Sequence, residues 1–157
     1  MDESGSTAYA NFREAIGTPF GPSAWITVNQ EGVDSFANAI SSRDAVHVNS
    51  ASAAASRQGG TIAQGFYIAG MIPKLIREMV RPAGFKPGIA YGMDGLRFPS
   101  FVRVGQNIRL SGTFESAEAS GSGVIARYGV TVEIEGGAKP ACVGTMLLRY
   151  TEDSANV

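Results

Sequence analysis

His47 is the sole histidine of the chain, and it lies in a polar segment ahead of a glycine-punctuated apolar stretch. Residues 41–47 read SSRDAVH, and residues 61–66 read TIAQGF. Histidine titrates near neutral pH and can therefore move protons. A helix beginning at Gly65 would leave its first backbone N–H groups available to a developing oxyanion. Together the two features indicate proton transfer on a carbonyl substrate.

The length and composition of the chain favour one globular domain. It has 157 residues, of which 44% are hydrophobic and 17% are charged, which is typical of a folded protein that buries a sizeable core. The formal net charge is −1 and the sequence has no dense Lys/Arg cluster, which argues against a nucleic-acid partner. The small charged share favours a surface that is covered in an oligomer, and we expect a homodimer.

Metal, membrane and secretory functions find no support in the sequence. One histidine and one cysteine, Cys142, do not make a His/Cys metal site, and we expect Cys142 to be a buried, inert strand residue. Polar residues interrupt the longest apolar stretch, residues 62–80, which excludes a membrane span. Residues 1–6 lack the basic and apolar regions of a secretory signal. We therefore expect a cytoplasmic protein without a cofactor.

The order of predicted elements indicates an α+β fold. After a flexible tail (1–8), residues 9–157 form the single predicted domain, with short helices at 9–16 and 32–40, a strand at 25–28, a loop at 41–50 and helical turns at 51–56. Residues 65–79 are apolar nearly all round, which is typical of a buried central helix, and Pro73 should kink it. Consecutive strands then follow at 89–98, 107–117, 123–135 and 142–151, and they exclude a doubly wound sheet. An antiparallel sheet wrapped around one long helix fits this order.

Four segments in this order resemble the MaoC-like hydratases and dehydratases, with the NodN-like branch the most similar. They are residues 40–49, 59–66, 91–99 and 102–105, and the resemblance covers roughly residues 20–150. It implies a single hotdog domain, in which an antiparallel sheet wraps a long central helix, and pairing into dimers. It also implies hydration of enoyl thioesters, or dehydration of 3-hydroxyacyl thioesters, carried on coenzyme A or acyl carrier protein.

The resemblance also assigns site residues, by way of the family signature Gly-Asp-x-Asn-Pro-Leu-His. His47 matches the catalytic histidine, and Gly65 matches the glycine that begins the central helix and whose N–H receives the thioester oxygen. Two departures from the signature are serious, and a third departure from the family lies just before the helix glycine. Ser42 stands where the family has its catalytic aspartate, Asp44 stands where it has asparagine, and Gln64 replaces the usual histidine before the helix glycine.

The departures leave several roles open, because the family reaction uses a carboxylate and an imidazole around one water. Asp44 either takes part in catalysis, for instance by orienting His47 as a triad carboxylate does, or caps the next turn or pairs with Arg43. Ser42 either binds a substrate oxygen or caps the preceding helix. Gln64 either donates its amide to the substrate carbonyl or lies on the surface.

Further residues are candidates for binding the substrate. Phe66, Tyr67, Tyr91 and Met93 either line the pocket or pack in the core. The isolated cations Arg97 and Arg103 either meet a phosphate of the carrier or are ordinary surface residues.

Three functions remain in view from the sequence. The first is a MaoC-type lyase with His47 as general base. The second is a repurposed hotdog enzyme that catalyses a cyclisation, isomerisation or pericyclic step in natural-product biosynthesis. The third is a non-catalytic subunit. A hydrolase elbow (Gly-x-Ser-x-Gly) and a nucleotide-binding loop are absent from the sequence.

Overall fold

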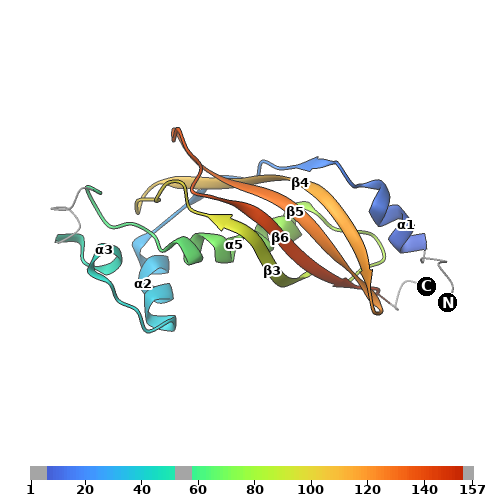
Figure 1. Cartoon of the computed structure of the whole chain (residues 1–157). Helices are drawn as coiled ribbons and strands as arrows, with labels where there is room; N and C mark the ends of the chain where they lie inside the picture. Colours follow the sequence, from blue (N-terminus) through green and yellow to red (C-terminus); the bar gives the residue numbers. More distant parts are fainter. Residues whose placement is uncertain (1–6, 52–57, 154–157) are drawn as a thin grey trace.

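A long helix lies along the inner face of one curved antiparallel sheet (Figure 1). The computed structural model describes residues 7–51 and 58–153. The helices in these ranges are α1 (Thr7–Glu14), α2 (Gln30–Ala39), α3 (Ala45–Val48) and α5 (Gly65–Met79). The strands are β1 (Pro19–Phe20), β2 (Ile26–Thr27), β3 (Ile89–Arg97), β4 (Asn107–Ser120), β5 (Gly123–Ile134) and β6 (Cys142–Thr151). The α+β architecture expected from the sequence is confirmed.

The sheet has its longest strands in the centre and one long strand at an edge. Its order is β1-β4-β5-β6-β3, and β2 also pairs with β4. All the pairings are antiparallel. The even-numbered residues of β5 are buried along its whole length, which confirms the alternation predicted for it and places that face toward α5. Among the described residues β3 pairs only with β6, which leaves its other edge open.

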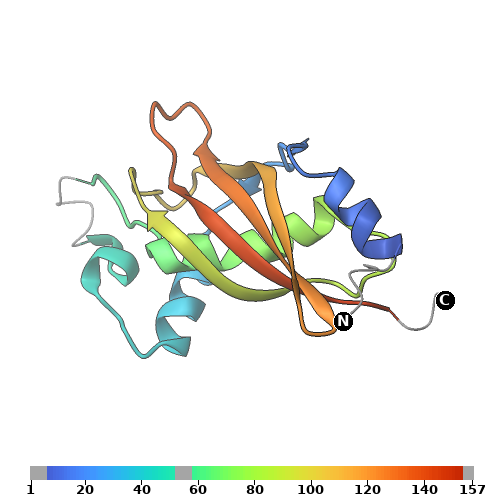
Figure 2. The same ribbon diagram turned by 45° about the vertical axis from the view of Figure 1, so that its right-hand side comes forward.

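Helix α5 is held in the sheet by one apolar face. Its buried residues follow the spacing of a single helical face and are Ile68, Ala69, Ile72, Leu75 and Ile76. Burying each of the larger ones stabilises the fold by about 1.5–3 kcal/mol relative to an exposed position. α2 and α3 lie at the N-terminal end of α5 and α1 lies at the other end (Figure 2). Among the residues described, no helix is long and apolar enough to cross a membrane.

Some boundaries differ from those predicted, and the largest difference concerns His47. The predicted loop at 41–50 contains the helical turn α3, so His47 lies on a helix. Strand β1 was not predicted, because Pro19 and the neighbouring glycines indicated a break; the strand is only two residues long and pairs with Thr113 and Gly112 of β4. Residues 1–6 of the predicted tail and 52–57 of the predicted turns lie outside the described residues.

Cys142 is the inert strand residue that the sequence predicted. Its side chain is fully buried at the start of β6. Burial raises the pKa of the Cys142 thiol to about 11, because the charged thiolate loses its hydration. The thiol therefore stays protonated near neutral pH, and protonated thiols are poor nucleophiles.

Two buried tyrosines share a hydrogen bond in the core. The hydroxyl oxygens of Tyr128 and Tyr150 are 2.9 Å apart, and both side chains are almost completely buried. Burial is the main cause that raises the pKa of both phenols. The rings also pack on Phe114 and Phe12, with centroid separations of 5.1 and 5.2 Å. Each hydroxyl therefore depends on the other in an otherwise aromatic environment.

We predict that Tyr128→Phe lowers the free energy of unfolding by about 1–3 kcal/mol, because it leaves the Tyr150 hydroxyl buried without its partner. The double variant Tyr128→Phe/Tyr150→Phe should be closer to the natural chain, since neither hydroxyl remains to be satisfied. Urea unfolding of the two single variants, Tyr128→Phe and Tyr150→Phe, and of the double variant measures this difference. Losses that simply add in the double variant would contradict the shared hydrogen bond.

Candidate active site

The helical turn α3 begins at Asp44 and carries His47. Asp44 is the N-cap of α3 and has an extended backbone, and the His47 amide donates to the Asp44 carbonyl at 2.9 Å. His47 is then the third residue of the helix, within one turn of Asp44. The chain between Asp44 and His47 is therefore a compact helical turn, and not the extended loop that the sequence predicted.

A backbone carbonyl fixes the imidazole of His47. Nδ1 lies 2.7 Å from the carbonyl oxygen of Ile62. A carbonyl only accepts hydrogen bonds, so Nδ1 carries the proton and donates it to Ile62. In the neutral ring Nε2 then has a lone pair and is the atom that can take a proton. The structure thus assigns the orienting role to Ile62, whereas Asp44 was one candidate from the sequence.

The Ile62 carbonyl is itself held on both sides. Its amide donates to the Val46 carbonyl at 3.1 Å, so α3 and residue 62 are joined by two hydrogen bonds. Ile62 also forms an antiparallel bridge with Arg103, and the Ala63 amide donates to the Val102 carbonyl at 2.8 Å. The position of the imidazole therefore follows from the chain just before β4.

Gln30 joins three parts of the site. Its Nε2 donates to the carbonyl of His47 and to Asp34 Oδ1, both at 2.8 Å. Its Oε1 accepts a 2.6 Å hydrogen bond from the Thr61 hydroxyl. Both amide hydrogens and the carbonyl oxygen are thus engaged. This contact ties the first residue of α2 to α3 and to the segment that carries Ile62.

His47 and Gly65 line one cavity of about 330 Å³ at the N-terminal end of α5. The amides of Tyr67 and Ile68 bond to the Gln64 carbonyl, whereas those of Gly65 and Phe66 have no acceptor within the helix. Such N–H groups, with the helix dipole behind them, stabilise negative charge. The cavity therefore combines a proton acceptor with a potential oxyanion site.

Gly65 is closely packed, so a larger residue at this position would displace the ring of Phe98. A Cβ atom built on Gly65 would lie 2.9 Å from ring carbons of Phe98, closer than side chains approach one another. Phe98 also makes an edge contact with Phe66, at a centroid separation of 5.7 Å. The aromatic ring thus lies against the first turn of α5 at the wall of the cavity.

Ser42 and Asp44 are joined to each other and not to the imidazole. The Ser42 hydroxyl donates to Asp44 Oδ2 at 3.1 Å, and the Asp44 side chain makes no cap hydrogen bond to α3. Asp44 is exposed. Neither residue belongs to the cavity lining. Ser42 therefore orients the carboxylate of Asp44, which is three residues before His47 in the sequence.

Gln64 is buried, so the surface alternative for it is wrong. Its side chain is 8% exposed, and Nε2 donates to the Val33 carbonyl at 3.3 Å. Oε1 is buried without a hydrogen-bond partner. The amide nitrogen proposed for the substrate is therefore directed to α2.

The other candidates for substrate binding lie outside the cavity lining. Tyr67 packs against Phe36 of α2 at 5.7 Å, Met93 packs against the core, and Tyr91 is 60% exposed on β3. Phe66 is 68% exposed at the start of α5. The opposite wall of the cavity comes instead from residues that were not predicted: Phe98, Pro99, Ser100, Phe101 and Val102. An apolar FPSF sequence in a loop is the signal that would have identified them.

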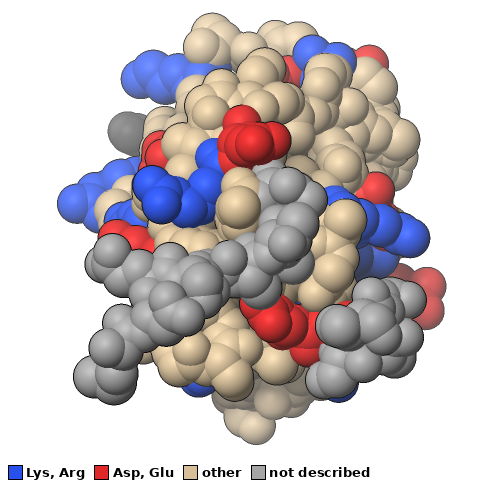
Figure 3. Space-filling model, turned by 90° about the vertical axis from the view of Figure 1, so that its right-hand side faces the viewer, with Lys and Arg blue, Asp and Glu red and all other residues tan. Residues whose placement is uncertain are grey.

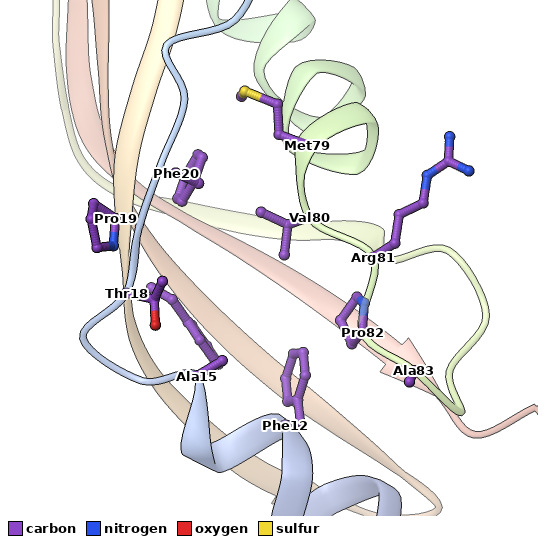
Figure 4. Close-up of a pocket in the computed structure, with 11 residues that line it drawn as sticks. Phe12, Ala15, Thr18, Pro19, Phe20, Met79, Val80, Arg81, Pro82 and Ala83 are labelled. Atoms are coloured by element: carbon purple, nitrogen blue, oxygen red, sulfur yellow. The ribbon is translucent and has the colours of Figure 1, made fainter.

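A second hollow, of about 400 Å³, lies at the other end of α5, between α1, β1 and residues 79–83 (Figure 4). Phe12, Phe20 and Val80 face into it, whereas the guanidinium of Arg81 points away. Its lining contains neither an imidazole nor a carboxylate. Proton-transfer chemistry therefore fits the His47 cavity better.

Within residues 7–51 and 58–153, no group of three or more His, Cys, Asp or Glu could hold a metal ion.

An antiparallel sheet curved around one helix, with a histidine cavity at the start of that helix, defines a hotdog-fold protein. The chain belongs to the MaoC-like family, because the family model described as "MaoC like domain" matches residues 11–134. This confirms the resemblance seen in the sequence.

Individual relatives agree with this assignment. 3-hydroxyacyl-thioester dehydratase Z of Mycobacterium tuberculosis is 39% identical over 142 residues, covering 90% of this chain and 94% of the relative. Nodulation protein N of Rhizobium leguminosarum bv. viciae is 36% identical over 143 residues, covering 84% of each. The structure of R-hydratase PhaJ1 from Pseudomonas aeruginosa superposes with a TM-score of 0.71 at 21% identity, covering 88% of this chain and 83% of the other.

We predict that neutral His47 is protonated at Nδ1. Because the chain has one histidine, a long-range proton–nitrogen NMR spectrum of protein without a histidine tag shows a single imidazole. At a pH where the ring is neutral, the nitrogen shifts should report Nδ1–H and an unprotonated Nε2. A spectrum of the Nε2–H tautomer would contradict the hydrogen bond to Ile62.

Proposed function

We propose that the protein is a hydro-lyase that dehydrates a 3-hydroxyacyl thioester, or hydrates the corresponding enoyl thioester, on coenzyme A or acyl carrier protein. The observation that carries the proposal is the orientation of His47, whose Nδ1 donates to Ile62 at 2.7 Å and leaves Nε2 as the base. The Gly65 amide lies on the same cavity. A relative named 3-hydroxyacyl-thioester dehydratase, 39% identical, supports the thioester class.

The reaction follows from these positions. Nε2 of His47 removes the proton from C2 of the thioester, and the negative charge that develops on the thioester oxygen is stabilised by the N–H groups of Gly65 and Phe66. The C3–O bond then breaks, and the leaving hydroxyl takes a proton from the imidazolium and departs as water. His47 returns to its neutral form, and hydration is the same sequence in reverse.

Asp44 replaces the missing family aspartate in this proposal, with Ser42 as its positioning residue. Asp44 supports this role by its place, because it is the N-cap of the turn that carries His47. The Ser42 hydroxyl engages Oδ2, and a carboxylate has further lone pairs to accept a hydrogen bond from the water or the leaving hydroxyl. In the proposal the imidazole and this carboxylate act on the same water from the cavity and from its edge, because Asp44 lies outside the cavity lining and two positions later than the aspartate of the family signature.

We predict that His47→Ala lowers kcat for hydration of crotonyl-coenzyme A by about 10²–10⁴-fold, the usual effect of losing a general base. Loss of enoyl-thioester absorbance measures the rate. Arg43→Ala, in the same segment but bonded to Asn38 of α2, is the matched control and should keep the natural rate. Equal rates for the natural chain and His47→Ala would remove His47 from the mechanism. A well-folded natural chain that leaves enoyl thioesters unchanged would instead favour a repurposed cyclase or isomerase, or a non-catalytic subunit.

Substitutions at Asp44 and Ser42 separate their two roles. Asp44→Asn should lower kcat by about tenfold, since a neutral amide oxygen is a weaker hydrogen-bond acceptor than a carboxylate, while Ser42→Ala should have a smaller effect because it removes only an orienting hydrogen bond. Both rates come from the crotonyl-coenzyme A assay. A larger loss for Ser42→Ala than for Asp44→Asn would assign the catalytic role to the serine.

We also propose that two copies pair through the open edge of β3. Ile89 and Tyr91 on this strand are 72% and 60% exposed, which is unusual for large apolar side chains on a sheet. An open strand edge exposes unpaired backbone N–H and C=O groups and invites pairing with another strand. Two identical β3 strands can pair antiparallel about a twofold axis, which closes both edges at once.

We predict that the natural chain is a dimer in solution and that Ile89→Asp/Tyr91→Asp makes it a monomer, because two charges would be buried in the contact. Light scattering after size-exclusion chromatography gives the mass. Ile16→Asp, at an exposed apolar residue after α1, is the control and should stay dimeric. A monomeric natural chain, or equal dissociation by the control, would contradict pairing through β3.

A further inference from the structure

A basic hollow of about 390 Å³ lies where α5 ends and β3 begins. Its lining includes Lys74, Arg77, Arg81 and Lys86, and the single carboxylate among the lining residues is Glu78. Glu78 pairs with Lys74 at 2.7 Å, so the lining keeps a surplus of positive charge. Basic side chains also stand in groups on both flanks of this end of the molecule (Figure 3). Such a hollow suits an anionic group.

Within one copy the hollow is far from His47. Helix α5 has 15 residues, so its two ends are about 22 Å apart. The same side of the helix nevertheless follows β3 along its length. Phe66 contacts Phe98, just after β3, and Arg77 donates to the carbonyl of Gly88, just before it, at 3.2 Å. β3 therefore has the His47 cavity at its C-terminal end and the basic hollow at its N-terminal end.

Pairing of two β3 strands brings these unlike ends together. In an antiparallel pair, the start of one strand lies beside the end of the other, and neighbouring strands are only about 4.8 Å apart. The start of β3 in a second copy, with its basic hollow, then lies beside the end of β3 and the His47 cavity in the first. In the dimer, each His47 cavity therefore lies next to the basic hollow of the partner subunit. The basic hollow of its own chain is at the far end of α5.

We propose that the basic hollow of one subunit binds the phosphate of the thioester carrier while His47 of the partner subunit acts on the acyl group. This inference rests on the proposed lyase function and on the pairing through β3. The carrier phosphate belongs either to the nucleotide part of coenzyme A or to phosphopantetheine, which coenzyme A and acyl carrier protein share. Lys74 and Lys86 are the binding residues that can be changed with least effect on the fold, because both side chains are exposed.

Arg97 and Arg103, the cations that the sequence suggested for this role, already donate to backbone carbonyls of their own chain. The Nε of Arg103 donates to the Gln58 carbonyl, and its guanidinium lies 5.7 Å from the ring centroid of Phe101. Nη1 of Arg97 donates to the carbonyl of Leu96 at 2.8 Å. The hollow of the partner subunit offers more positive charge than these two side chains.

The first test compares carriers with and without phosphate. Lys74→Glu/Lys86→Glu should raise KM for crotonyl-coenzyme A about tenfold or more, because two charge contacts become repulsive, and should leave turnover of crotonyl-N-acetylcysteamine unchanged. Arg149→Glu is the matched control: Arg149 pairs with Ile89 in the sheet but is exposed on the face away from α5. An equal rise in KM for both thioesters, or no rise for the coenzyme A thioester, overturns the proposal.

A parallel rise for crotonyl-acyl carrier protein assigns the contact to phosphopantetheine, and a rise for coenzyme A alone assigns it to the nucleotide.

The second test asks which subunit supplies the cations. A mixed dimer is isolated through two affinity tags, free of histidine, with one copy carrying His47→Ala and the other Lys74→Glu/Lys86→Glu. Its only intact His47 is on the charge-reversed copy. If the hollow acts across the dimer, that site uses the intact cations of its partner, and the mixed dimer shows the KM of the natural chain at about half its kcat. The raised KM of the charge-reversed homodimer would show that the hollow serves its own chain, and would overturn the proposal.

Binding of coenzyme A distinguishes failure of this inference from failure of the proposed function. Natural chain that turns over neither thioester contradicts the lyase function. Calorimetric titration with coenzyme A still tests the hollow, and Lys74→Glu/Lys86→Glu should weaken binding about tenfold relative to the natural chain and Arg149→Glu. Equal affinity in all three proteins overturns the phosphate site whether or not the protein is a lyase.

Discussion

The hydrogen bond from His47 Nδ1 to the Ile62 carbonyl is the interaction on which the site depends. It fixes the tautomer of the ring and leaves Nε2 as the basic atom. Ile62 is itself positioned by its neighbours, since it bridges to Arg103 and donates to Val46 of α3. A neutral backbone group performs this task, so no buried carboxylate has to be stabilised next to the imidazole.

The second constraint is the burial of α5 in the sheet. Its apolar face fixes the helix along the strands. Its first residue, Gly65, therefore lies next to the segment that follows β3. Close packing of Phe98 against Gly65 brings the N-terminal N–H groups of the helix to the cavity wall. The same burial places the last turn of α5 at the start of β3, where Arg77 bonds to Gly88. One helix thus links the proposed oxyanion site to the proposed phosphate site.

Much of the fold could be predicted from the sequence because its signals are periodic. The bounds of α5 and the alternation of β5 were both correct, since a buried helix and a half-buried strand repeat their patterns over many residues. Short elements were missed for the opposite reason. α3 has four residues, too few for a periodic signal, and β1 is two residues long and exists because β4 is available to pair with it.

The site was predictable only in part. His47 and Gly65 could be identified from residue types and family resemblance, and the structure brings them to one cavity. The carbonyl of Ile62 could not be identified, because every residue has one and only the fold selects which faces the ring. Gln64 was misjudged as a possible surface residue, since its burial against Val33 depends on how α2 packs. Contacts between distant segments set these details, and a single sequence does not encode them locally.

A crystal structure with a non-hydrolysable 3-hydroxyacyl-coenzyme A analogue tests the central claim most directly, because it measures the distance from His47 Nε2 to C2 of the acyl group. The account predicts a separation of about 3.5 Å or less, with the analogue's carbonyl oxygen at the amide of Gly65. An acyl group bound elsewhere, or an imidazole whose Nε2 faces away from C2, would contradict the assignment of His47 as the base.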